Sequence, residues 1–178
     1  MERTGTRYMP ENSFRSKKSA TKARYGKFGE DSVDKMVQWT VEHVPPSTRP
    51  TILEIGSGNG LLLFSLVHEE GYSPHSCCGI DYSADAVRLA KSIAENRGMH
   101  DITFETCDFL SQDPPPIWED QRNAGRLDTW DLLLDKGTYD AIALSEKDLV
   151  GASPICVYPS RAARLIRPGG FFLITCKS

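Results

Sequence analysis

Short apolar runs recur along the chain, and amphipathic or polar segments separate them. Five of these runs predict β-strands, at residues 51–55, 77–81, 102–107, 130–135 and 171–175. Apolar residues at helical spacing predict α-helices at residues 31–44, 60–71, 84–98 and 158–166. The strands are apolar instead of alternating, so helices are expected to cover both faces of the sheet.

The alternation of strands and helices predicts an α/β fold of the Rossmann-like, doubly wound type, with a mostly parallel sheet and helices on both faces. In such sheets, ligands bind at the carboxyl ends of the strands, near the point where the strand order reverses. The chain has 178 residues, a length typical of one domain. Candidate functional residues are therefore those that directly follow strands.

A glycine-rich loop follows the first predicted strand in "ILEIGSGNGLLLFSL", residues 52–66. Glycine weakens strands and helices, but it allows a tight turn and lets a ligand approach the backbone without a Cβ atom in the way. A tight turn without a ligand is the alternative explanation. We assign to cofactor binding this loop and the acid before it: Glu54, Gly56, Ser57, Gly58, Asn59 and Gly60.

The spacing of the loop narrows the choice of ligand. A dinucleotide fingerprint requires G-x-G-x-x-G, whose third glycine would stand where this chain has Leu61, and a P-loop requires G-K-[ST], which is absent. The carboxylate of Glu54 would repel a pyrophosphate but suits a cation. S-adenosylmethionine carries an ammonium and a sulfonium and no phosphate, so the charge pattern favours it over NAD.

Further ligand-binding residues follow the second and third strands. Asp81 stands 25 residues after Gly56, where an acid accepts hydrogen bonds from ribose hydroxyls. A helix-start acid facing the helix dipole is the alternative role for Asp81. Next to it, Tyr82 is expected to pack on the adenine, while Asp108 binds the adenine amine and Phe109 covers its ring.

Charge is distributed unevenly along the chain, whose net charge is −3. Residues 1–27 carry eight Lys and Arg residues against two Glu residues, whereas the remainder carries 13 basic and 22 acidic side chains. We expect residues 1–27 to form a basic, poorly ordered leader, with a contact to nucleic acid or to an acidic partner as the alternative. The acidic body argues against nucleic acid as the main ligand and suits a basic protein partner.

Cysteine spacing and hydropathy bear on the compartment. None of the five cysteines forms a C-x-x-C pair, so neither a zinc site nor a disulfide framework is indicated, and no metal is expected. No apolar run approaches the roughly 20 residues of a membrane span, and the N-terminus lacks a signal-peptide core. These features predict a protein of the cytoplasm or the nucleus with no membrane partner.

The segments "LEIGSGNG", "GIDYS", "CDFL" and "LIRPGGFFLIT" resemble, in order, the motifs of class I S-adenosylmethionine-dependent methyltransferases. "LLLDKGTYDAI" resembles the signature of eukaryotic lysine methyltransferases that act on translation elongation factor 1-alpha, and "KFGEDSVDKMVQWT" is similar to their N-terminal segment. The resemblance implies S-adenosyl-L-methionine as cofactor and a lysine of that factor as acceptor. It also implies substrate or lid roles for Phe28, Glu30, Trp39 and Tyr139, although Lys27 stands where the family has an aromatic residue.

Asp135 ends the fourth strand, where donor and acceptor are expected to meet. It is the candidate catalytic residue, which would orient the methionine part of the donor or accept from the incoming ammonium. The alternative is a strand-end turn in which Lys136 pairs with Asp135. Because "DKGT" replaces an Asn-Pro-Pro-Tyr motif, the segment argues against a DNA amino-methyltransferase. We also expect Glu30 and Asp135 to belong to an acidic rim that meets the basic factor.

The resemblance assigns residues 28–178 to a methyltransferase domain that is incomplete at its C-terminus, because the family continues with a helix and an antiparallel hairpin. The preferred function is transfer of methyl groups to a lysine of elongation factor 1-alpha by a monomer. Two alternatives stay open. One is a small-molecule methyltransferase, and the other is an inactive donor-binding module.

Overall fold

Five parallel strands form one sheet in the order β3-β2-β1-β4-β5. They are β1 (Ile52–Ile55), β2 (Cys77–Asp81), β3 (Thr103–Thr106), β4 (Trp130–Lys136) and β5 (Ile166–Thr175). The computed structural model describes residues 27–117, 129–144 and 154–175. The order runs outward from β1 in both directions, so the strand order reverses between β1 and β4, as the predicted doubly wound topology requires.

The helices are α2 (Lys27–His43), α3 (Leu61–Glu70), α4 (Ala84–Asn96), α6 (Thr138–Ala143) and α7 (Tyr158–Leu165), with short 3-10 turns η2 (Pro46–Thr48), η3 (Pro74–Ser76) and η4 (Pro154–Val157). The chain divides into two units, residues 1–31 and 32–178. The description below concerns the second unit. The expected leader, residues 1–27, lies almost entirely outside the described residues.

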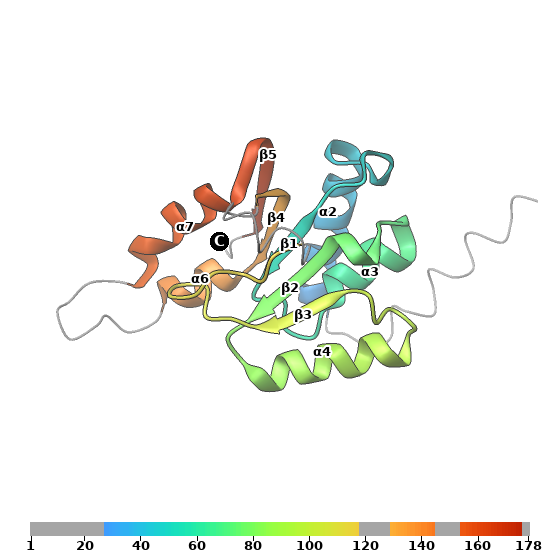
Figure 1. Ribbon diagram of the computed structural model, residues 1–178, viewed down its shortest axis with the longest axis horizontal. Helices are drawn as coiled ribbons and strands as arrows, with labels where there is room; N and C mark the ends of the chain where they lie inside the picture. Colours follow the sequence, from blue (N-terminus) through green and yellow to red (C-terminus); the bar gives the residue numbers. More distant parts are fainter. Residues whose placement is uncertain (1–26, 118–128, 145–153, 176–178) are drawn as a thin grey trace, which may run out of the picture. The chain divides into compact units, whose positions relative to one another are not determined.

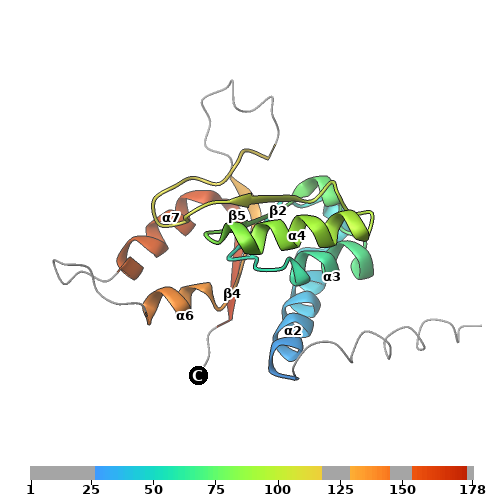
Figure 2. The same ribbon diagram turned by 90° about the horizontal axis from the view of Figure 1, so that it is seen from below.

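Helices cover both faces of the sheet (Figures 1 and 2). On one face, α2, α3 and α4 pack on Ile52, Leu132 and Leu134. On the other face, α6 and α7 pack on residues of alternate parity, such as Leu53 and Leu133. Because neighbouring positions of a strand point to opposite faces, a strand buried on both sides must be apolar throughout. The predicted α/β fold is confirmed.

Local signals set most of the helix boundaries. The Ser83 hydroxyl accepts a hydrogen bond from the amide of Ala86 and caps α4, as expected from an N-cap serine. Gly71 ends α3 in the left-handed conformation with φ of 77°. Among the described residues, no helix is long and apolar enough to cross a membrane.

Two elements differ from the sequence-based expectation. Strand β5 begins at Ile166 and not at 171, because residues expected only to stop α7 continue alongside β4 through an irregular register opposite Trp130 and Leu132. Helix α6, six residues long, was not predicted. It lacks the repeated apolar spacing that signals a helix, and it begins directly after the carboxyl end of β4.

Candidate functional site: the carboxyl edge of the sheet

The glycine-rich loop leaves β1 and enters α3 at the carboxyl edge of the sheet. All three of its glycines have positive φ, with values of 69° at Gly56, 54° at Gly58 and 79° at Gly60. The amides of Gly56 and Ser57 both donate to the carbonyl of Ile80 on β2, at 2.8 and 2.9 Å. The loop is therefore held against β2, and its backbone conformation is one that other residues adopt at a cost.

The three glycines of the loop differ in what a Cβ atom at each position would contact. A Cβ atom at Gly56 would lie 1.8 Å from the Thr138 hydroxyl oxygen, and one at Gly60 would lie 2.7 Å from the ring of Phe104. A Cβ atom at Gly58 would meet nothing within 4 Å. Internal packing thus explains two of the glycines. Gly58 is the position where the backbone faces open space and a ligand can approach.

Asp81 links the loop to the start of α4. Its buried carboxylate accepts hydrogen bonds from the amides of Gly58 and Ser83, both at 2.9 Å, one on each oxygen. A carboxylate has about four lone-pair sites, so each oxygen retains capacity for a further donor such as a ribose hydroxyl. Asp81 therefore lies beside Gly58, the glycine that faces open space, and its ribose role stays a prediction. The side chain of Asn59, in contrast, accepts from the amide of Leu61 inside the loop.

Glu54 is buried beneath the loop on the face covered by α3. Burial raises the pKa of Glu54 to about 8, and this rise is opposed by Lys136 and by the hydrogen bond from the Leu63 amide. Its Oε2 atom and the hydroxyl of Ser57 have no hydrogen-bond partner among the described residues. With a pKa of about 8 the carboxyl is mostly protonated at neutral pH, and a cation bound beside it would favour its ionised form.

The residues expected around the adenine differ in their exposure. The side chain of Tyr82 is 82% exposed directly after Asp81 and is free to pack on a ligand. Asp108 is exposed, and its carboxylate accepts from the amide of Leu110 and the hydroxyl of Ser111. Phe109 is buried with its ring 4.8 Å from that of Tyr158. The expectation that Phe109 covers the adenine is not supported, because its ring forms part of the core under α7.

The structure corrects one of the two roles expected for Asp135, its place in an acidic rim, and its catalytic role stays a prediction. This residue is 0% exposed, so it cannot belong to an acidic rim. Its carboxylate accepts from the amides of Thr138 and Tyr139, at 2.7 and 2.9 Å, and from the hydroxyl of Tyr158. Burial raises the pKa of Asp135, and these three hydrogen bonds oppose the rise. Asp135 thus holds the start of α6, and the ion pair to Lys136 that the alternative proposed is not found among the described residues.

The expected substrate and lid residues are not brought together. Trp39 stacks on His43 at 4.2 Å and meets the ring of Phe171 edge-on at 5.5 Å. Phe171 pairs with Leu132, three residues before Asp135, so Trp39 packs away from the carboxyl edge. Its expected substrate contact is not supported. Tyr139 lies in the first turn of α6, next to the site.

Phe28 and Glu30 belong to the first turn of α2, in the other unit of the chain, and their side chains lie outside the described residues. Their substrate or lid roles stay predictions. The expectation that Glu30 belongs to an acidic rim also stays a prediction.

Thr138, Tyr158 and Arg161 support the site, and the sequence-based assignment missed them. Thr138 belongs to the "DKGT" segment, which was the available signal. Arg161 of α7 donates to the carbonyls of Phe109 and Gln112 and so fixes the segment after β3. The sequence carried no comparable signal for Tyr158 and Arg161, because a Tyr and an Arg on a short amphipathic helix are ordinary.

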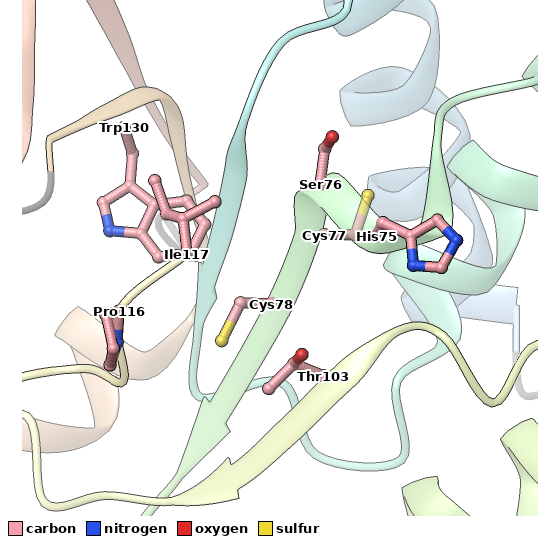
Figure 3. A pocket seen from close by; sticks show the side chains of 8 residues that line it. All are labelled: His75, Ser76, Cys77, Cys78, Thr103, Pro116, Ile117 and Trp130. Atoms are coloured by element: carbon pink, nitrogen blue, oxygen red, sulfur yellow. The ribbon is translucent and has the colours of Figure 1, made fainter. Parts of the chain in front are cut away.

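Two hollows lie away from this edge of the sheet. Figure 3 shows a cavity of about 10 Å³ at the amino ends of β2 and β4, between Cys78, Thr103, Ile117 and Trp130. Its volume is about that of one water probe. A groove of about 280 Å³ runs between α4 and β3 and is lined partly by Lys91, Glu95 and Glu105. In the described ranges, no three His, Cys, Asp or Glu residues are arranged to hold a metal ion.

A family model described as "Methyltransferase domain" matches residues 47–178 of this chain. The chain belongs to the methyltransferase domain family. The matched region contains the glycine-rich loop, Asp81 and the "DKGT" segment. These three elements of the site therefore all lie within the region that the family model matches.

Relatives in sequence agree with this assignment. The chain is 38% identical to "Protein-lysine N-methyltransferase efm4" of Schizosaccharomyces pombe, over 83% of this chain and 63% of that protein. It is 34% identical to "EEF1A lysine methyltransferase 2" of Mus musculus, over 83% of this chain and 54% of that protein. The chain thus spans a little more than half the length of these relatives.

Among solved structures, the PH0226 protein of Pyrococcus horikoshii superimposes with a TM-score of 0.59 at 17% identity, over 84% of this chain and 58% of that one. The CcbJ methyltransferase of Streptomyces caelestis gives 0.58 at 15% identity, over 80% and 47%. At these identities the likeness concerns the fold alone. The fold of this methyltransferase domain is therefore the one that the sequence predicted.

Proposed function

We propose that this methyltransferase domain binds S-adenosyl-L-methionine at the carboxyl edge of the sheet and methylates a lysine of elongation factor 1-alpha in the cytoplasm. The observation that carries the substrate is the 34–38% identity to proteins named as lysine methyltransferases, one of them for EEF1A. The observation that supports the donor is the carboxylate of Asp81 beside the open backbone of Gly58.

The residues present fit this donor. Asp81 would accept from the two ribose hydroxyls, because each of its oxygens has one backbone donor and a remaining lone pair. Glu54 supplies a buried carboxyl with a free acceptor, and it would stabilise the positive charge that distinguishes this donor from NAD. Tyr82 would cover an aromatic ring next to Asp81.

The chemistry asked of the chain is mainly positioning. When bound, the donor supplies a methyl carbon already activated by its sulfonium. The protein must then hold an uncharged acceptor amine in line with that carbon. A lysine has an ordinary pKa near 10.4, so the acceptor must lose a proton first, and an apolar surrounding favours its neutral form. Tyr139, which lies next to the carboxyl end of β4, would help to form such a surrounding.

The test is transfer of labelled methyl groups from S-adenosylmethionine to purified elongation factor 1-alpha. We expect methyl-lysine on the factor when this domain is present within a chain as long as its relatives, and loss of the signal in Asp81→Ala. Mass spectrometry then locates the modified lysine. If that longer protein binds S-adenosylhomocysteine but leaves the factor unlabelled, the proposed substrate is wrong. Label found only in small molecules would favour the small-molecule alternative.

A further inference from the structure

Asp135 and Tyr158 form a buried pair that the donor site does not use directly. The Tyr158 side chain is 1% exposed, and its hydroxyl donates to Asp135 Oδ2, the oxygen that also accepts from the Tyr139 amide. Burial and the adjacent Asp135 raise the pKa of the Tyr158 hydroxyl, so it remains a donor. No lysine or arginine side chain in the described ranges pairs with Asp135. Hydrogen bonds alone must therefore hold its charge.

The ring of Tyr158 is held independently of its hydroxyl. Its centroid lies 4.8 Å from that of Phe109, 5.3 Å from that of Tyr139 and 6.3 Å from that of Phe172. A phenylalanine would keep these aromatic contacts and lose only the hydrogen bond to Asp135. The function of the hydroxyl can therefore be separated from the packing of the ring.

Asp135 connects Tyr158 to the start of the glycine-rich loop through hydrogen bonds of Thr138. Its other oxygen accepts from the amide of Thr138, and the Thr138 hydroxyl donates to the carbonyl of Ile55 at 3.0 Å. The same hydroxyl oxygen occupies the space that a Cβ atom at Gly56 would need. Thr138, the first residue of α6, is thus held by Asp135 through its amide and by the end of β1 through its hydroxyl.

We propose that Tyr158 is a positioning residue of the donor site, whose hydroxyl keeps the Asp135 carboxylate as the acceptor that seats α6 on the glycine-rich loop. This inference rests on the proposed donor site, but it concerns a residue that does not touch the donor. A carboxylate accepts on both oxygens, whereas a protonated carboxyl turns one of them into a donor and loses part of its hold on the two amides.

The groups around Asp135 determine in which direction its pKa moves when the Tyr158 hydroxyl is lost. Asp140 on α6 raises the pKa of Asp135, and Glu54 on β1 interacts with Asp135 electrostatically. Tyr139 and Tyr158 face it with polar groups that favour the charged form. Loss of the Tyr158 hydroxyl therefore raises the pKa of Asp135 further. The carboxyl then takes up its proton at a higher pH than in the parent protein.

The experiment compares S-adenosylhomocysteine affinity of the parent chain and of Tyr158→Phe between pH 8.0 and pH 5.5. We expect the ratio of their dissociation constants to grow at least threefold as the pH falls, because Asp135 takes up its proton at a higher pH in the variant than in the parent chain. Groups that do not interact with Asp135, and the ligand itself, titrate alike in both proteins and cancel in the ratio. In an Asp135→Asn background, Tyr158→Phe should add less than a twofold change at either pH.

Tyr72→Phe is the matched control. Tyr72 is 3% exposed, and its hydroxyl donates to the carbonyl of Val44 at 2.8 Å, with no carboxylate involved. We expect its affinity profile to run parallel to that of the parent. A parallel profile for Tyr158→Phe, or an equal divergence for Tyr72→Phe, would overturn the proposal.

A measurement without ligand separates this proposal from the proposed function. Amide hydrogen exchange at Thr138 and Tyr139 should accelerate at least threefold more in Tyr158→Phe than in Tyr72→Phe at pH 6, after correction for the intrinsic rate. Unchanged protection at both amides would refute the role of Tyr158 whether or not the chain binds donor. Failure of the parent chain to bind S-adenosylhomocysteine would instead refute the donor site.

Discussion

The hydroxyl of Thr138 donates a 3.0 Å hydrogen bond to the main-chain carbonyl of Ile55. This bond joins the "DKGT" segment to the glycine-rich loop, 83 residues earlier in the chain. It explains the order of residues in the segment: Asp135 accepts the amide of Thr138, Gly137 turns the chain at φ of 87°, and Thr138 meets the loop. The segment is thus a docking element for the loop.

Replacement of Gly56 by Ala should therefore unseat Thr138. The added Cβ would lie 1.8 Å from the Thr138 hydroxyl at a φ of 69°, so we expect a loss of about 2–4 kcal/mol in the free energy of unfolding. Chemical denaturation measures this loss. Gly71→Ala is the control, because it shares the positive φ but has open space, and it should cost about 1–2 kcal/mol. Equal losses at the two positions would contradict the steric argument.

Asp81→Asn tests the ribose contact. The amide keeps the size of the side chain but loses one acceptor oxygen, and it directs its NH₂ group at a backbone amide. We expect the affinity for S-adenosylhomocysteine, measured by calorimetry, to fall at least tenfold, equivalent to about 1.4 kcal/mol. Asp85→Asn removes the same charge four residues later and should leave the affinity within threefold. An unchanged affinity in Asp81→Asn would remove this residue from the site.

Glu54 should make the protein less stable as the pH rises. Burial raises the pKa of Glu54 from 4.5 to about 8, so between these values the unfolded carboxyl is ionised while the folded one stays protonated. Unfolding then releases a proton, and the free energy of unfolding falls by up to about 1.4 kcal/mol per pH unit. Glu54→Gln should flatten this slope in urea denaturation between pH 5 and 8. Glu42→Gln, on the exposed side of α2, should retain it.

Trp39→Leu distinguishes a structural role from a substrate role. The change removes the stacking on His43 and the edge contact with Phe171, so we expect a loss of about 1–3 kcal/mol in the free energy of unfolding. Donor affinity should stay within threefold, as measured by calorimetry at a temperature where the variant is folded. A large loss of donor affinity in a stable variant would restore Trp39 to the site.

The parts of the fold that the sequence predicted are those with local signals. Continuous apolar runs marked β1, β2 and β4, and Ser83 marked the start of α4. Helix α6 has no such signal, because its first turn depends on a carboxylate at the end of β4 and on a tyrosine from α7. Such partners become visible only when the chain has folded.

The same distinction applies to the site. Backbone requirements, such as the positive φ of the glycines, could be recognised from residue type alone. The burial of Asp135 and Phe109 could not be recognised in this way, because the sequence does not tell whether a carboxylate or an aromatic ring that follows a strand is buried or exposed. Their burial follows from packing against Tyr158 of α7.

The ring of Phe104 has a consequence for how this sequence can vary. Cβ atoms at Gly60 and at Gly79 would each lie 2.7 Å from this ring, which comes from the outermost strand β3. A larger residue at either glycine requires a smaller residue at position 104, and it also requires a shift of Ser57, 2.8 Å from a Cβ atom at Gly79, or of the Phe64 ring, 3.0 Å from one at Gly60. In a library randomised at these three positions and selected for donor binding, the surviving sequences should show them changing together. Positions 60 and 79, 19 residues apart, would covary through a third residue that need not touch the ligand.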